Sequence, residues 1–334
     1  MTLLLAAPAA GEGAVRDVVV DEPSVGAARI SASAATGRYA VNDGSGATIA
    51  ISVTAACQVS CDAAEPQRIA NFIGTLIHGP EVDLLTVQLD TPFQIEFDCG
   101  FGAQACYYPR ESKIVIGGSD TPAYDGVSRE FILAHEYGHH VANHRYSPAP
   151  FPAAIDWGPP RWASLERVCQ ARRRGILFPG DEGLHYRENP GEAFAEAFAR
   201  YRFPDSAPRW RWVEFLEPGA AAFRAIREDA LHPWPGRTSF RLRGRAPPRR
   251  RGGAVEALRT PLDGTVSLHP SDQRRRRYQL SLLSPTGQLL STSRHGLSIR
   301  RQLNFTVCGQ SRLRLQLEST RRAPAPFQLL VQRP

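Results

Sequence analysis

The chain has 334 residues, of which 42% are hydrophobic and 22% are charged, and it carries a formal net charge of +7. This composition is typical of a folded globular protein and excludes a fully disordered chain, and the length allows about two domains. No apolar run approaches the ~20 residues that a membrane-spanning helix requires.

The N-terminal region has the composition of a processed leader. Leu3 to Ala10 form an apolar stretch followed by small residues, as at the end of a signal peptide. A disordered Ala-rich tail is the alternative interpretation. We interpret residues 1–56 as a leader and N-terminal segment with one strand near Thr48–Val53, and we expect a secreted or cell-envelope protein.

Helix and strand patterns alternate between residues 57 and 127. Asp62 can cap a helix over 63–78, in which Pro66 lies in the first turn and Gly79-Pro80 follows the end. Alternating apolar residues predict four strands, at 84–90, 93–97, 106–108 and 113–117.

Helical patterns dominate the next part of the chain. Ser128 can cap a helix that continues to Arg145, and a Pro-rich loop follows at 146–160. Further helical patterns occur at 161–174, 190–201 and 207–229. We therefore expect an α+β domain over residues 57–235.

Residues 236–334 differ from the rest in both pattern and charge. Six short alternating runs separated by turn signals predict an antiparallel β-sandwich, with a flexible loop at 245–253. This region carries 20 Arg and 4 acidic residues, a net charge of +16, whereas residues 1–235 carry −9. The excess favours contact with an anionic cell surface. In the whole chain, 39 of the 40 basic residues are Arg. Such a skew is typical of a GC-rich genome, and we therefore do not interpret it as specific nucleic-acid binding.

The six cysteines indicate a disulfide framework. Cys57 and Cys61 lie close together, as do Cys99 and Cys106, and Cys169 and Cys308 stand apart. An even count with two close pairs suits an oxidising compartment. Neither close pair has the spacing of a zinc ribbon. The simplest pairing is Cys57–Cys61, Cys99–Cys106 and Cys169–Cys308.

The helix after Ser128 contains the motif His-Glu-x-x-His, at His135, Glu136 and His139. Residues four apart share one helix face, so both imidazoles can reach one metal ion. Neutral imidazole suits Zn2+, and a catalytic zinc uses three protein ligands and one position for water. Glu136 follows the first ligand and can act as the general base for that water.

The third zinc ligand has to come from elsewhere in the chain. In the pattern HExxHxxGxxH it would fall at Arg145, and His144 is one residue short of that position. Glu192 and Glu196 lie four apart in the apolar sequence ENPGEAFAEAFARY, where burying two acids is costly unless they are paired or bound to metal. The alternative places both glutamates on a solvated outer face.

HEYGHH followed by NPGEAFAEAFA resembles the gluzincins, which are zincin metallopeptidases with a glutamate as third ligand. The pattern is most similar to lethal-factor-type catalytic domains and to secreted zinc peptidases of high-GC bacteria. This resemblance implies a zincin-like domain, Glu192 as third ligand, and Glu196 as an acid beside a zinc-bound histidine. It also implies that Tyr186, or else His185, donates to the substrate oxyanion, and that strand 114–117 is the sheet edge to which a peptide adds.

The sequence as a whole predicts an exported zinc endopeptidase acting on a protein or peptide substrate. The zinc would be held by His135, His139 and Glu192. The alternative is a non-catalytic, zinc-containing protein that binds the cell surface or wall through its basic C-terminal part.

Overall fold

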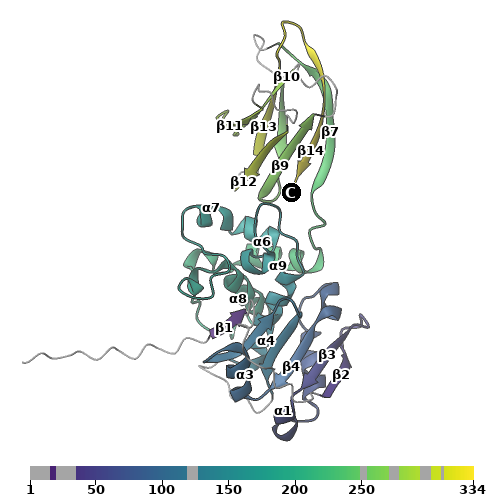
Figure 1. Cartoon of the computed structure of the whole chain (residues 1–334), viewed down its shortest axis with the longest axis vertical. Coiled ribbons are helices and arrows are strands. Elements are labelled where there is room, and N and C mark those ends of the chain that lie inside the picture. The colour runs from purple at the N-terminus through teal and green to yellow at the C-terminus, as the bar shows by residue number, and fades with distance from the viewer. Residues whose placement is uncertain are drawn as a thin grey trace, which may run out of the picture. The chain divides into compact units, whose positions relative to one another are not determined.

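The computed structural model describes residues 16–19, 35–118, 127–248, 254–270, 278–293, 302–309 and 312–334, with side chains from residue 36 onward (Figure 1). The expected leader at Leu3 to Ala10 lies outside these residues. The chain divides into two compact units. The first contains the described residues up to Leu76, together with Val82–Tyr137 and Asp205–Pro208, and the second contains Ile77–Glu81, Gly138–Pro204 and Arg209–Pro334.

A six-stranded mixed sheet organises the first unit, with the strand order β1-β5-β6-β4-β3-β2. The strands are β1 (Arg16–Val19), β2 (Ala35–Ala40), β3 (Thr48–Val53), β4 (Thr86–Asp90), β5 (Ala103–Tyr108) and β6 (Lys113–Gly117). β3, β4 and β6 run parallel, whereas β2 and β5 are antiparallel to their neighbours β3 and β6. The predicted strands at 48–53 and 113–117 are confirmed, and β1 and β2 were not predicted.

The strand expected at a sheet edge is an interior strand. β6 pairs with β4 on one side, where Ile114 lies opposite Val87, and with β5 on the other, where Val115 lies opposite Cys106. Both backbone edges of β6 are therefore occupied. The expectation that a peptide adds to strand 114–117 is wrong for this topology, in which β1 and β2 are the outer strands.

A helix replaces the strand expected at 93–97. α3 (Pro92–Cys99) begins after Thr91, has Pro92 in its first turn, and ends at Gly100, whose φ is +107°. It buries Ile95 and Cys99, which lie four residues apart on one helix face. The alternation of Phe93, Ile95 and Phe97 suggested a strand, but both phenylalanines are exposed, at 81% and 69%.

The other helices of the first unit are α1 (Ala55–Ser60), α2 (Glu65–Ile73) and the first part of α4 (Arg129–Asn143). α2 is shorter than the helix predicted at 63–78, because it ends at Gly74. Asp62 accepts a hydrogen bond from the backbone N–H of Ala64 at 2.9 Å, just before α2 begins. A 3-10 turn at Pro80–Leu84 delays the strand predicted from residue 84, which begins at Thr86.

The second unit contains the end of α4 and the five helices that follow it. They are α5 (Ala154–Trp157), α6 (Pro160–Leu165), α7 (Val168–Arg173), α8 (Pro190–Arg202) and α9 (Ala220–Leu231). The helix predicted at 161–174 is broken, because Arg167 has a left-handed φ of +56°. The helix predicted at 207–229 forms only from Ala220, and the prediction at 190–201 is confirmed.

Two antiparallel sheets complete the second unit. Their orders are β11-β10-β13-β8 and β12-β9-β14-β7. The strands are β7 (Thr238–Ala246), β8 (Ala254–Arg259), β9 (Gly264–Pro270), β10 (Tyr278–Leu283), β11 (Leu289–Thr292), β12 (Leu303–Val307), β13 (Arg312–Ser319) and β14 (Ala325–Arg333). Leucines of both sheets, such as Leu268 and Leu315, share one buried cluster. The α+β class is confirmed, β8 and β11 were not predicted, and most of the expected loop at 245–253 lies outside the described residues.

Three disulfides link helices and strands within the two units. The bonds Cys57–Cys61, Cys99–Cys106 and Cys169–Cys308 form as expected from the spacing. The third joins α7 to the end of β12, where Asp263 N–H also donates to Ser164 Oγ at 2.9 Å. In the described part of the chain, no helix has the length and apolar character needed to span a membrane.

Candidate metal centre

α4 presents two buried histidines on one face. The helix begins beside Ser128, whose Oγ accepts a hydrogen bond from Phe131 N–H at 3.2 Å, so the predicted cap is confirmed. His135 and His139 follow one turn apart and are each 1% exposed. Glu136 lies between them in the sequence, and its side chain is fully buried.

α8 supplies the carboxylate. Asn189 caps this helix, because its Oδ1 accepts a hydrogen bond from Gly191 N–H at 3.0 Å. The same side chain also binds the preceding loop, through Gly180 N–H at 3.2 Å and Glu182 Oε1 at 2.8 Å. Glu192 therefore lies in the first turn of α8, where it is fully buried.

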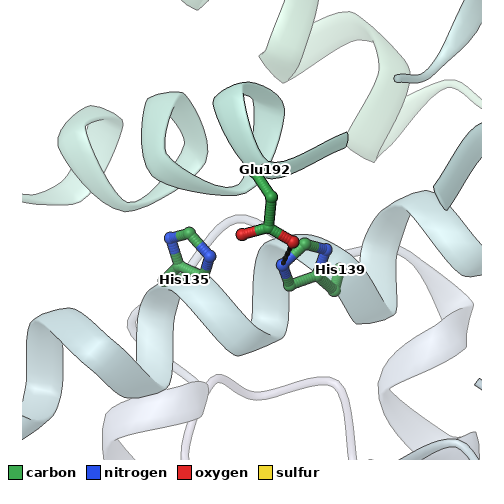
Figure 2. A group of neighbouring side chains, drawn as sticks. All are labelled: His135, His139 and Glu192. Atoms are coloured by element: carbon green, nitrogen blue, oxygen red, sulfur yellow. Dashed lines mark ion pairs between the residues drawn. The ribbon is translucent and has the colours of Figure 1, made fainter. Parts of the chain in front are cut away.

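His135, His139 and Glu192 form one compact group (Figure 2). One ligand atom from each lies within 4.8 Å of the others, and His139 Nε2 is 3.2 Å from Glu192 Oε1. Zinc bonds of about 2.1 Å in a tetrahedron place ligand atoms about 3.4 Å apart, so this separation suits the ion. Figure 2 shows both imidazoles rising from α4 toward the carboxylate that descends from α8. The group can hold a metal ion.

A second group of potential ligands in the described residues does not qualify. It contains Cys169, Asp263 and Cys308. The two sulfur atoms are joined in a disulfide and cannot bind a metal as thiolates. Burial raises the pKa of Asp263 to about 6, and its Oδ1 accepts a hydrogen bond from Gly309 N–H at 2.6 Å. This carboxylate links the residue before β9 to the turn after β12.

The two candidate oxyanion donors lie in different surroundings. Tyr186 Oη donates a hydrogen bond to Glu192 Oε2 at 3.0 Å, so it lies beside the metal group. The imidazole of His185 stacks on Phe178, with ring centroids 3.7 Å apart and an interplanar angle of 9°. Tyr186 is therefore the better placed of the two, and its role as a donor stays a prediction.

Glu196 lies one turn after Glu192 on α8 and is only 2% exposed. The interpretation that both glutamates occupy a solvated face is therefore wrong. Glu196 Oε1 accepts a hydrogen bond from Arg200 Nε at 3.1 Å, and the residue is not a member of the metal group. Its expected role beside a histidine ligand stays a prediction.

A buried network fixes the end of α4. Arg145, at the position where a third histidine was excluded, donates to Glu81 Oε2 at 2.9 Å and to the carbonyl oxygens of Asp229 and Ala230 at 2.6 and 2.9 Å. His140 Nε2 donates to the Glu81 carbonyl at 2.9 Å, and burial lowers the pKa of this imidazole to about 3. His140 is therefore neutral at physiological pH, and both residues are structural.

Two glycines allow α8 to approach its neighbours closely. A Cβ on Gly138 would lie 2.9 Å from Ala195 Cα and 3.1 Å from Phe198 Cβ, so α4 and α8 cross here with almost no space between them. Gly138 lies in the interior of α4, where glycine costs about 1 kcal/mol relative to alanine, and the close approach of α8 explains its presence. A Cβ on Gly191 would overlap the carbonyl oxygen of Ile155 in α5, and sequence reasoning missed this position.

Replacing Gly138 with alanine is expected to lower the free energy of unfolding by about 1–3 kcal/mol, although alanine favours helix by about 1 kcal/mol. The cause is that the added methyl meets the backbone of α8, which cannot move aside as a side chain can. Urea unfolding of the metal-free protein measures the change. Gly183→Ala is the control, because its Cβ would meet only Asp181 Oδ1 at 3.5 Å. Equal stabilities of the two variants would contradict the close crossing.

Comparisons with known proteins do not identify a family for this chain. No protein-family model matches the chain, and no curated protein matches its sequence. Among solved structures, the chain is similar to Legionella pneumophila aminopeptidase A in complex with aspartic acid, at 12% identity and a TM-score of 0.26. The match covers 88% of this chain and only 36% of that protein. A likeness at this level does not assign a fold or an activity.

Proposed function

We propose that the protein is an exported zinc-dependent endopeptidase. The observation that carries the proposal is the buried group of His135, His139 and Glu192, with the carboxylate of Glu136 next to the first histidine in the sequence. The resemblance of HEYGHH and NPGEAFAEAFA to gluzincins supports the same ligand set. The three disulfides are compatible with export.

The donor set favours zinc over other common ions. Two imidazole nitrogens and one carboxylate oxygen match the ligand set of thermolysin-type catalytic sites, which leave one position open. Ca2+ and Mg2+ prefer oxygen ligands alone, so two histidines argue against them. Zinc bound there would act as a Lewis acid and would lower the pKa of its water.

Two side chains of this protein would then have separate roles in hydrolysis. Glu136 accepts the proton of the attacking water and later returns it to the leaving amine. Tyr186, whose hydroxyl is 3.0 Å from Glu192 Oε2, donates to the oxyanion of the substrate carbonyl. No residue forms a covalent bond with the substrate. The reaction class is peptide-bond hydrolysis by an activated water.

The direct test measures metal content and proteolysis on the same preparation. We expect about one zinc ion per chain, because the group offers three ligand atoms around one point. Cleavage of casein should stop with a chelator and return when zinc is added back. A folded protein without zinc would contradict the proposal. Zinc at this stoichiometry without cleavage of casein or of a peptide library would favour the alternative of a non-catalytic zinc protein at the cell surface.

A further inference from the structure

The outer strand β7 carries a row of arginines on one face. Its residues point alternately to two faces, as successive side chains of a strand do. Phe240 and Leu242 pack against the core cluster, and Ala246 is buried. The intervening Arg241, Arg243 and Arg245 are all exposed. These three residues, which we name the arginine row, therefore lie on the outward face about 7 Å apart.

Gly244 shows that this alternation is held by packing. Gly244 is exposed, but it lies opposite Phe327 on β14 and a Cβ there would be 3.0 Å from that ring, so this position points to the same face as the buried Phe327. A register slip of one residue would turn the arginines into the core and the apolar side chains outward. The outward direction of the row is therefore a fixed property of the sheet.

Among the described residues, no acidic side chain lies opposite the arginine row on the neighbouring strand β14. The residues opposite it on β14 are Leu330, Gln328 and Pro326, which are uncharged. Within the described ranges, no ion pair involves any of the three arginines, although ten ion pairs of other arginine or lysine residues occur there. Three like charges on one strand face without a counter-charge are unfavourable in the isolated protein. An anionic partner would relieve that repulsion.

Two further arginines extend the row at one end. Ser319 N–H donates to the Pro247 carbonyl at 2.7 Å, so the end of β13 is joined to the chain just after β7. Arg321 and Arg322 follow directly in the next turn and are both exposed. Exposed positive charge thus continues into the turn beside the end of β7, an arrangement that suits a linear partner.

The residues around the arginine row argue against two classes of anionic partner, single-stranded nucleic acids and lipid surfaces. Single-stranded nucleic acid is held by stacking on aromatic side chains, but the aromatic residues described on these strands, Tyr278, Phe327, Phe240 and Phe305, belong to or pack against the core cluster. A lipid surface is bound through apolar side chains that insert beside the charges. The large exposed apolar residues of the two sheets are Val255 and Leu289, and both belong to the other sheet.

We propose that the arginine row of β7, extended by Arg321 and Arg322, binds a linear acidic polysaccharide. Guanidinium groups pair with sulfate, phosphate or carboxylate groups through two parallel hydrogen bonds. A polymer with repeated charges can satisfy several arginines along one strand at once. Such polymers occur outside the cell, where the three disulfides of this chain are stable. The inference does not depend on the metal centre.

The test compares two triple variants of the full chain. The first, Arg241→Gln, Arg243→Gln and Arg245→Gln, removes the row. The second, Arg259→Gln, Arg312→Gln and Arg314→Gln, removes three exposed arginines from the other sheet and changes the net charge equally. Heparin serves as the acidic polysaccharide, and dextran serves as the uncharged one. Affinity is measured over a range of salt concentrations.

We expect heparin affinity to fall about tenfold or more in the first variant and less than about threefold in the second. The salt dependence should also become shallower by about three released counterions in the first variant only. Equal losses in both variants would overturn the proposal, since they would reflect net charge alone. Tighter binding of duplex DNA or of phosphatidylglycerol vesicles than of heparin would overturn it as well.

A purely protective role for these charges predicts a different result. Charged residues on an outer strand can prevent sheets from joining edge to edge. If the first variant self-associates in size-exclusion chromatography but keeps its heparin affinity, the arginine row serves protection and the proposal fails. A monomeric first variant with wild-type thermal stability and weakened heparin binding supports the proposal.

Discussion

Glu192→Ala is expected to reduce bound zinc from about one ion per chain to a trace. Glu192 Oε1 lies 3.2 Å from His139 Nε2, and the residue provides the carboxylate oxygen of the metal group. Losing one of three protein ligands should weaken zinc affinity by more than the 10–100-fold typical of residues that only support a ligand. Competition with a chromophoric chelator gives the affinity, and metal analysis gives the stoichiometry.

Glu196→Ala is the matched control for this experiment. It removes the same kind of side chain from the same helix one turn later, and Glu196 is also buried, at 2% exposure. Its Oε1 is held by Arg200 at 3.1 Å, so we expect zinc to be retained with at most a 10–100-fold loss of affinity. Retained zinc in Glu192→Ala together with lost zinc in Glu196→Ala would move the third ligand by one helical turn.

Glu136→Gln should keep zinc and lose turnover by about 10²–10⁴-fold. Glutamine has the same shape as glutamate, but its amide cannot accept the proton of the attacking water. Glu136 is fully buried. Because glutamine has the same size and shape, the replacement should fit this buried position without displacing the helix. Cleavage of a fluorogenic peptide chosen from the casein fragments measures kcat/KM, and metal analysis of the same sample confirms that the ligands are intact.

A second glutamate of α4 provides the control for Glu136. Glu130 lies in the first turn of the helix and is 45% exposed. Glu130→Gln makes the same chemical change on the same helix and should leave both zinc content and kcat/KM within a factor of about two, as for most surface substitutions. A Glu136→Gln protein that retains zinc and more than a tenth of the wild-type kcat/KM would exclude Glu136 as the general base.

Local patterns in the sequence were sufficient for the helix that carries the histidines. Ser128, the apolar periodicity and the spacing of His135 and His139 lie within one segment, so no distant contact was needed to interpret them. The choice of Glu192 required more, because spacing alone does not distinguish it from Glu196. It rested on the resemblance to gluzincins, and in the structure Glu192 is the carboxylate grouped with the two histidines where α8 passes close to α4 at Gly138.

Other errors have physical causes that a single sequence does not reveal. The alternation of Phe93, Ile95 and Phe97 predicted a strand because apolar residues are usually buried, but two of these three are exposed on α3. Arg167 breaks the helix predicted at 161–174 by adopting a left-handed φ of +56°, which is unusual for a residue other than glycine.

The bond between Cys169 and Cys308 spans 139 positions of sequence. Cutting the backbone anywhere between these positions would leave two fragments that still migrate as one species until a reductant is added. A shortened chain that ends near residue 235, as the composition change suggests, would carry Cys169 without its natural partner and would be prone to dimerise through it. Any division of this protein into separately produced pieces therefore has to replace that cysteine as well.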